Sequence, residues 1–309
     1  MNATTLSLAA PSLRHPSAAD SQVPWREPQH VVVETCVEDV EGVRVSARAG
    51  ADRAELCDNL AAGGTTPSIG AVEAAIFVAA EEIERRRAVA GAHWASGPAS
   101  TPLGLRIMIR PRGGSFVFDA DEARAMMADV RRIAALSLQM SEFTRPQRVG
   151  GAGPALPPAV DLGFVVGTLT EEHTIDRGLL RLLVDLAEGA PVTFSKAIDV
   201  TRDPIEAYGD LGGLGVGYVL TSGGAATAVE GAEVLRGMVA AGRAGGGPRV
   251  VAAGSVRPES VAQVVEAGGV HEVHMRCSVP GATWQEPQRT EEAQVRRAVE
   301  VARALPLPS

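Results

Sequence analysis

Short apolar runs rich in β-branched residues alternate along the chain with longer stretches of helical spacing. Eight runs have the length and composition of buried strands, and they cover residues 30–36, 53–57, 104–110, 161–166, 191–196, 216–221, 249–253 and 271–275. Between them, apolar residues recur every three or four positions in stretches that include 71–87, 120–138, 176–188, 225–241 and 259–267. A strand followed by a helix, repeated eight times, predicts an α/β fold, a TIM-type (β/α)₈ barrel that forms a single domain. A doubly wound open sheet is the alternative, but no G-x-G-x-x-G sequence follows the first run to support dinucleotide binding.

Four segments lie outside this alternation and set the expected boundaries. Residues 1–29 are rich in Ser, Ala and Pro, so we expect a disordered tail there, with an organelle-targeting peptide as the alternative. The barrel is expected to span 30–304. Within it, 88–102 and 139–159 are rich in Gly, Pro, Ser and Ala, and we expect mobile insertions on the amino-terminal side of the barrel, remote from the site. Residues 305–309 contain two prolines and are predicted to be an unstructured tail.

Composition and charge narrow the class of partner. Hydrophobic residues make up 45% of the chain and aromatic residues only 4%, so the core must be built mainly from Val, Leu, Ile and Ala. A net charge of −8 argues against nucleic acid as a partner, because phosphate binding needs clustered Lys and Arg. Membrane association is not expected, because no apolar run approaches the roughly 20 residues of a membrane span. Only three cysteines are present, without a secretory signal, which indicates a reducing, cytoplasmic location.

Polar and reactive side chains are concentrated where the predicted strands end. In a barrel of this kind the active site lies at the carboxyl ends of the strands. The residues at or just beyond these ends are Glu34, Cys36, Glu55, Cys57, Arg110, Arg112, Lys196, Asp199, Ser222, His274 and Cys277. We expect five of them to line one pocket, namely Glu34, Glu55, Arg110, Arg112 and Ser222. Lys196, Asp199 and His274 complete the candidate catalytic set.

Three motifs resemble those of a known family. Residues 50–68, GADRAELCDNLAAGGTTPS, resemble the signature of the CutC copper homeostasis family. Residues 108–114, MIRPRGG, and 220–225, LTSGGA, are similar to its second and third motifs. The resemblance covers roughly 31–277 without the two insertions. It implies a TIM barrel, copper tolerance and copper binding, mostly in the cytoplasm, and it implies no particular chemical reaction.

The chain also departs from the family pattern. A His-Arg-Ala-Phe-Asp pattern usual after the fifth strand is matched here by residues 195–199, where Ser195 replaces the histidine. Three glycines usual after the seventh strand are matched by residues 253–255, AGS, and the small residues usual after His274 are replaced by Met275 and Arg276. A mechanism that needs the fifth-strand histidine would be impaired.

The three cysteines are the candidate metal ligands. Cys36 and Cys57 end neighbouring strands, about 4.8 Å apart, and Cys277 follows the strand that closes the barrel. Soft thiolates select Cu(I), so Cys36 and Cys57 are the expected copper(I) ligands, with Cys277 as a third. The alternative is that each cysteine is a small buried hydrophobic residue.

The carboxylates and arginines support a second hypothesis. Glu34 and Glu55 share strand parity with the two cysteines and can act as acid and base or hold a cation. Arg110 and Arg112 suit a small anionic ligand, because the guanidinium group binds carboxylate or phosphate through two hydrogen bonds, and the turn at 223–224 can add backbone N–H groups. The alternative is a structural ring of Glu–Arg ion pairs.

Lys196 is the single lysine of the chain. It is either a Schiff-base residue or a replacement that keeps the charge of the family's arginine. Three hypotheses for the whole protein therefore remain: a cytoplasmic copper-binding protein, a TIM-barrel enzyme acting on a small anionic metabolite, or a scaffold without chemistry. Catalysis, substrate and homo-oligomer formation stay open at this stage.

Overall fold

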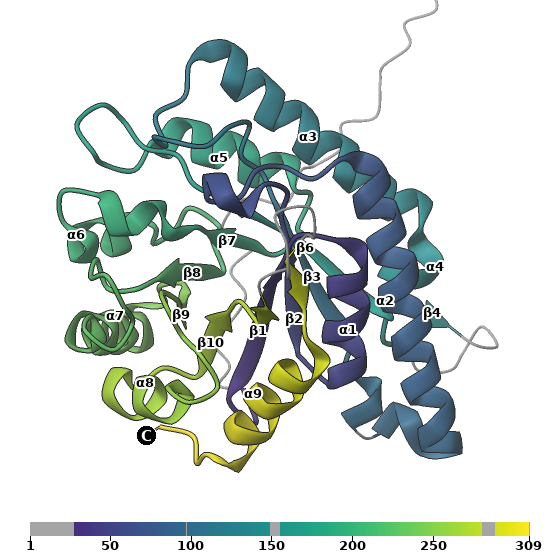
Figure 1. Ribbon diagram of the computed structural model, residues 1–309. Coiled ribbons are helices and arrows are strands. Elements are labelled where there is room, and N and C mark those ends of the chain that lie inside the picture. The colour runs from purple at the N-terminus through teal and green to yellow at the C-terminus, as the bar shows by residue number, and fades with distance from the viewer. Residues whose placement is uncertain (1–27, 97, 149–154, 280–287, 309) are drawn as a thin grey trace, which may run out of the picture.

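Eight parallel strands close into a barrel in the computed structural model, which describes residues 28–96, 98–148, 155–279 and 288–308 (Figure 1). They are β1 (Val32–Val37), β2 (Arg53–Leu56), β3 (Leu103–Met108), β6 (Val160–Val166), β7 (Val192–Phe194), β8 (Tyr218–Thr221), β9 (Arg249–Ala252) and β10 (Glu272–Met275). Each strand pairs with the next along the chain, and β10 pairs with β1. The predicted barrel is confirmed, and every predicted strand overlaps an observed one.

Helices surround this barrel on all sides (Figure 1). They are α1 (Val40–Ala49), α2 (Ile69–Ala90), α3 (Ala120–Gln139), α5 (Arg177–Leu186), α6 (Pro204–Asp210), α7 (Ala232–Gly245), α8 (Val261–Gly268) and α9 (Glu292–Ala304). Several helices begin at a residue whose side chain accepts a hydrogen bond from a backbone N–H group of the first turn. Asp119 accepts from the backbone of Glu122, whose own carboxylate accepts from Asp119 N. The α7 helix begins seven residues later than its apolar pattern predicts, because a turn occupies the segment between β8 and this helix.

The two expected insertions carry short regular elements. In the first, residues 88–90 extend α2, and 3₁₀ helices cover Gly91–Ser96 and Pro98–Ser100. The second contains α4 (Ser141–Thr144) and the antiparallel pair β4 (Gln147–Arg148) and β5 (Ala155–Leu156). Arg87 joins the two segments, since its guanidinium donates to the carbonyl of Pro158 at 2.6 Å and stacks on Trp94. Parts of both segments thus carry regular elements, and the expectation that they are mobile insertions stays a prediction.

The two predicted tails differ in how much of each the structure describes. Residues 1–27 of the predicted tail lie outside the described residues. At the other end, residues 305–308 form no helix or strand, yet Leu305 and Leu307 pack against the core. The carbonyl of Pro308 lies 2.9 Å from Nε2 of His271. The predicted unstructured tail thus lacks regular structure but is held to the barrel.

Side chains point alternately to the two faces of the barrel wall. Outward residues and the helices form the main apolar core, which includes Val33, Leu56 and Ile107. Inward residues are unusual for this fold, because most such barrels fill the interior with bulky branched side chains. Here one inward cluster consists of Cys36, Cys57, Met108 and Val165, and another of Tyr218, Leu220, Val251 and Ala253. Between them lie buried charges.

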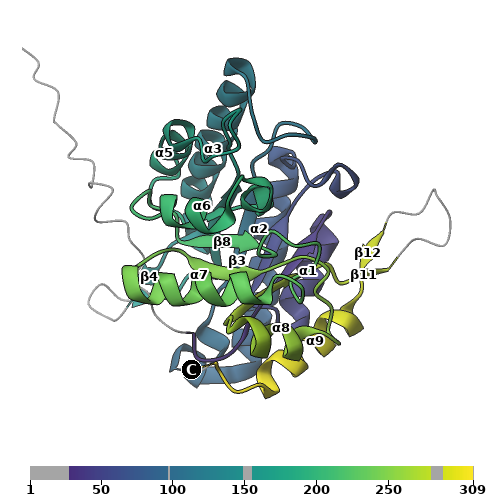
Figure 2. The same cartoon turned by 90° about the vertical axis from the view of Figure 1, so that its left-hand side faces the viewer.

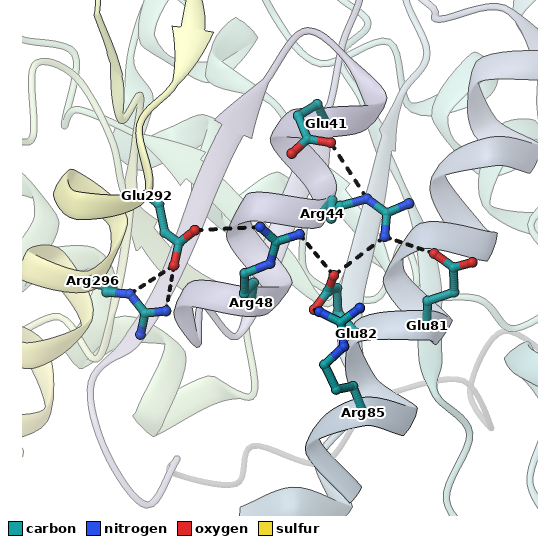
Figure 3. A network of polar contacts seen from close by, with 8 residues as sticks. All are labelled: Glu41, Arg44, Arg48, Glu81, Glu82, Arg85, Glu292 and Arg296. Atoms are coloured by element: carbon teal, nitrogen blue, oxygen red, sulfur yellow. Dashed lines mark hydrogen bonds and ion pairs between the residues drawn. The ribbon is translucent and has the colours of Figure 1, made fainter. Parts of the chain in front are cut away.

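A network of ion pairs joins the helices on one side of the molecule (Figure 3). The buried carboxylate of Glu82 on α2 lies 3.4 Å from Arg44 and 3.1 Å from Arg48, both on α1. Arg48 also lies 3.7 Å from Glu292 at the start of α9. Exposed ion pairs each contribute little to the stability of the fold, but the buried carboxylate of Glu82, which two arginines of α1 share, holds α1 against α2.

Figure 2 shows α7, α8 and α9 along one side, with the antiparallel pair β11 (Ser278–Val279) and β12 (Arg289–Thr290) projecting beyond them. Among the described helices, none combines the length and apolar character that a membrane crossing requires.

Candidate metal site and its surroundings

Two thiols and a carboxylate meet inside the barrel near the carboxyl ends of β1 and β2. Cys36 lies on β1, Glu55 lies opposite it on β2, and Cys57 directly follows β2. Because alternate residues of a strand point the same way, Glu55 and Cys57 both face inward. The Sγ atoms of the two cysteines and a carboxylate oxygen of Glu55 all lie within 4.8 Å of one another. Their residues are only 9%, 2% and 1% exposed for Cys36, Glu55 and Cys57 respectively.

His274 joins this group from the strand on the other side of β1. The register of β1 and β10 pairs Glu34 with His274. Nδ1 of His274 lies 2.8 Å from Oε1 of Glu34, and its Nε2 lies 3.7 Å from Oε2 of Glu55. The imidazole also hydrogen-bonds to the thiol of Cys36. Three adjacent strands, β10, β1 and β2, therefore supply one polar cluster.

The two cysteines differ in electrostatic environment. The hydrogen bond from Cys57 lowers the pKa of Cys36 well below its usual value, against the opposing effect of burial, and His274 lowers it further. The same thiol–thiol hydrogen bond and burial raise the pKa of Cys57 well above its usual value. The two thiols therefore titrate as a pair, in which Cys36 is the more acidic member.

The charge of His274 is fixed by its carboxylate neighbours. Burial alone would lower its pKa, but hydrogen bonds to Cys36 and Glu34 and the charge of Glu55 raise the pKa well above the usual value. Burial, then the negative charge of Cys36, raises the pKa of Glu55 well above its usual range. Oε1 of Glu55 is buried without a hydrogen-bond partner, which is costly unless a further group binds there.

A closed ion-pair network lies beneath the thiols. Arg53 lies 2.5 Å from Glu34 and 2.5 Å from Glu272, and Arg249 lies 2.9 Å from Glu272. The guanidinium groups of Arg53 and Arg249 lie 4.9 and 4.5 Å from the ring centre of Tyr218. Burial opposes ionisation of Glu34, but Arg53 and His274 hold the pKa of Glu34 far below its usual value. The network thus forms a rigid, charged floor.

The arginines expected to bind an anion are engaged by the protein. Arg110 donates to the carbonyls of Gly63 at 3.0 Å and Gly114 at 2.6 Å, and its guanidinium stacks 4.3 Å from the ring centre of Phe116. Burial, then the nearby charge of Arg112, lowers the pKa of Arg110. Arg110 therefore fastens the loop after β2 to the loop after β3.

Arg112 has an equally complete set of partners. It forms a two-point ion pair with Glu122 at 2.5 and 3.0 Å and donates to the carbonyls of Ser115 and Val117, each at 2.9 Å. The expected convergence of both arginines with Glu34 and Glu55 is thus replaced by loop bracing. The arginines contact loop carbonyls and Glu122 instead of Glu34 and Glu55, so an anion pocket stays a prediction that these contacts do not support.

Lys196, Asp199 and Ser222 form a separate cluster at the ends of β7 and β8. Nζ of Lys196 lies 2.5 Å from Oδ2 of Asp199 and 3.0 Å from Oγ of Ser222. Asp199 also accepts from the backbone N–H groups of Ser222 and Gly224 at 3.0 Å each. Of the two backbone N–H groups that were expected to bind an anion, that of Gly224 therefore donates to Asp199, and that of Gly223 donates to Oγ1 of Thr221 at 2.8 Å.

Cys277 does not join the other cysteines. It shares strand parity with Val273 and Met275, which face outward, and all three belong to the main core. Burial and the charge of Glu259 raise its pKa to about 12, so its thiol stays protonated at neutral pH. The three-residue group of Cys36, Glu55 and Cys57 does not include it.

The sequence analysis missed the charged floor, because its members lie at the start of the strands. Arg53, Arg249 and Glu272 each open a strand. A signal was nevertheless present. Arg53 stands two residues before Glu55, and Glu272 two before His274, so each shares the inward parity of a residue already singled out.

Comparison with known proteins identifies the family. The family model described as "CutC family" matches residues 31–143 and 159–279. The chain belongs to the CutC family. The match corrects one detail, because the CutC model includes the first expected insertion and leaves out only residues 144–158 between its two segments.

Similar proteins come from bacteria and animals. A CutC family protein of Pasteurella multocida is 31% identical over 243 residues, 79% of this chain and 80% of that one. The human protein named copper homeostasis protein cutC homolog is 31% identical over 247 residues, 80% of this chain and 72% of that one. A crystal structure of CutC from Streptococcus agalactiae superposes with a TM-score of 0.62 at 26% identity, covering 79% of this chain and 98% of that one.

Proposed function

We propose that this protein binds Cu(I) through Cys36 and Cys57 and that this binding is its role in copper homeostasis. The observation that carries the proposal is the convergence of two buried thiols and the Glu55 carboxylate within 4.8 Å. Thiolates are soft ligands that select Cu(I), and a pair of them is enough for near-linear coordination. The name of the human relative, a copper homeostasis protein, agrees with this chemistry.

The residues present suit such an ion. Cys36 is the more acidic of the two thiols, and Cys57, whose pKa is raised, has to lose its proton when a metal binds. Glu55 has a buried oxygen without a hydrogen-bond partner beside the thiols, and that oxygen can take up this proton or approach the ion. His274, whose pKa is raised, places a positive charge next to Cys36 and offsets the negative charge of the thiolate.

The same proposal also covers the third cysteine and the cellular location of the protein. Cys277 is assigned no role, because it lies in the outer core with a protonated thiol. We place the protein in the cytoplasm, since its three cysteines are all unpaired and reduced thiols are the state that a reducing compartment maintains.

The test is a titration with Cu(I) under anaerobic, reducing conditions, with a chromophoric chelator as competitor. We expect one Cu(I) per chain, lost in the Cys36→Ser, Cys57→Ser double variant. Cys277→Ser is the matched control and retains full binding. Absence of binding to the native protein, or equal binding by the double variant, would overturn the proposal.

A further inference from the structure

A methionine side chain lies in the same buried cluster as the two thiols. The buried inward cluster consists of Cys36, Cys57, Met108 and Val165, and Leu60 packs on it from the loop after β2. Met108 is the last residue of β3, the strand that pairs with β2. The register pairs Leu56 with Ile107, so the next residues along each strand, Cys57 and Met108, stand side by side and face inward.

We propose that the thioether of Met108 is a third sulfur ligand of Cu(I), beside Cys36 and Cys57. This inference rests on the proposed function and names one more residue of the same site. It is drawn from the chemistry of the group that surrounds the thiols, in which three types of side chain compete for the third position: Glu55, His274 and Met108.

Charge argues against the carboxylate as that ligand. Cu(I) with two thiolates carries a net charge of −1, which the positive charge of His274 can offset, and an ionised Glu55 would add a further negative charge among buried residues. Uncompensated buried charge is strongly unfavourable. A thioether is neutral and soft, so it adds a donor that Cu(I) prefers without adding charge.

Existing contacts argue against the imidazole. Nδ1 of His274 lies 2.8 Å from Glu34, and Nε2 lies 3.7 Å from Glu55 in a ring that also hydrogen-bonds to Cys36, so both ring nitrogens are already engaged within the protein. The sulfur of Met108, by contrast, belongs to the same apolar cluster as the two thiols.

The apolar residue above the three sulfur atoms affects which metal ion the site selects. Leu60 packs over the cluster, and its backbone N–H donates to Glu38 at 2.9 Å, which holds this cover in place. Three sulfur donors in a site that excludes water favour Cu(I) over hard or strongly hydrated ions.

The first experiment compares two methionine variants of the full chain. Met108→Leu removes the thioether and nearly keeps the volume, whereas Met238→Leu makes the same change at a fully buried site on α7, in the outer core. In a chelator competition with Cu(I), we expect Met108→Leu to lose affinity about tenfold or more, as loss of a supporting metal contact does. Met238→Leu should match the native protein.

The second experiment reads the ligand directly. The protein is produced with selenomethionine, loaded with one Cu(I), and measured by X-ray absorption at the copper edge. We expect a selenium neighbour of copper close to the roughly 2.3 Å of a metal–sulfur bond. It should disappear in Met108→Leu and persist in Met238→Leu.

The outcomes separate this inference from the function on which it rests. Copper uptake with two sulfur neighbours and no selenium overturns the role of Met108 and leaves the proposed function standing. A native protein that takes up no Cu(I) overturns both. Equal affinity of Met108→Leu and the native protein also contradicts the inference.

Discussion

Nδ1 of His274 lies 2.8 Å from Oε1 of Glu34, inside the barrel and next to Cys36. Arg53 holds Glu34 in its ionised form, and the ionised carboxylate holds a proton on His274. The charged floor, built from Arg53, Arg249 and Glu272, is therefore connected through two residues to the thiol that is expected to bind copper.

The first prediction concerns His274. Replacing it by Gln removes a hydrogen bond and a positive charge that lower the pKa of Cys36. The thiolate should then form only at higher pH. The measurement is the ultraviolet absorbance of the thiolate as a function of pH in metal-free protein, with Cys36→Ser as the control that removes the signal. An unchanged titration in His274→Gln would show that the imidazole has no influence on the thiol.

The second prediction concerns Glu34 and acid. Its pKa in the folded protein lies far below the value of 4.5 typical of an exposed Glu, so the stabilisation is present above about pH 4.5 and is lost as the pH falls further. At neutral pH, Glu34→Gln breaks a buried pair and should lower the free energy of unfolding by about 3–5 kcal/mol. The measurement is urea denaturation at pH 7 and at acid pH.

The difference between Glu34→Gln and the native protein should shrink on acidification. Glu41→Gln serves as the control, because Glu41 forms an exposed pair with Arg44 and should change stability little at either pH. A pH-independent difference would mean that the charge of Glu34 is not what stabilises the fold.

The third prediction separates loop bracing from anion binding. Arg110→Ala leaves the carbonyls of Gly63 and Gly114 without a donor and should destabilise the protein by about 1–3 kcal/mol. Denaturation of the variant and calorimetry of the native protein with phosphate and dicarboxylates are the measurements. Tight anion binding by the native protein that the variant loses, without a loss of stability, would restore the anion pocket.

The fourth prediction uses two glycines with the same backbone conformation. Gly64 and Gly189 have φ values of +87° and +84°, so alanine is strained by about 1–2 kcal/mol at either position. A Cβ on Gly64 would lie 3.3 Å from Sγ of Cys57, whereas among the described residues no heavy atom beyond the chain neighbours of Gly189 would lie within 4 Å of a Cβ there. Gly64→Ala should therefore weaken Cu(I) binding and Gly189→Ala should not. Equal Cu(I) affinity of the two variants would contradict this.

Local pattern predicted the barrel well, because short apolar runs, most of them with β-branched residues, can be recognised without a distant partner. The strand β2, with the sequence RAEL, contains no β-branched residue. Parity likewise indicated that Glu34 and Cys36, and Glu55 and Cys57, face the same way. The partners of Arg110 are backbone carbonyls of two loops, and such contacts leave no mark in the sequence. Cys277 was assigned by closeness to the strand end, although its parity with Met275 already indicated the outer face.

The central claim is that copper lies between Cys36 and Cys57, and anomalous diffraction tests it most directly. Crystals grown under anaerobic conditions with one equivalent of Cu(I) would be measured on both sides of the copper edge. We predict a single anomalous peak inside the barrel, bonded to both Sγ atoms at about the 2.3 Å of a metal–sulfur bond. A copper peak bonded to neither sulfur, or full copper content without a peak at this position, would contradict the account.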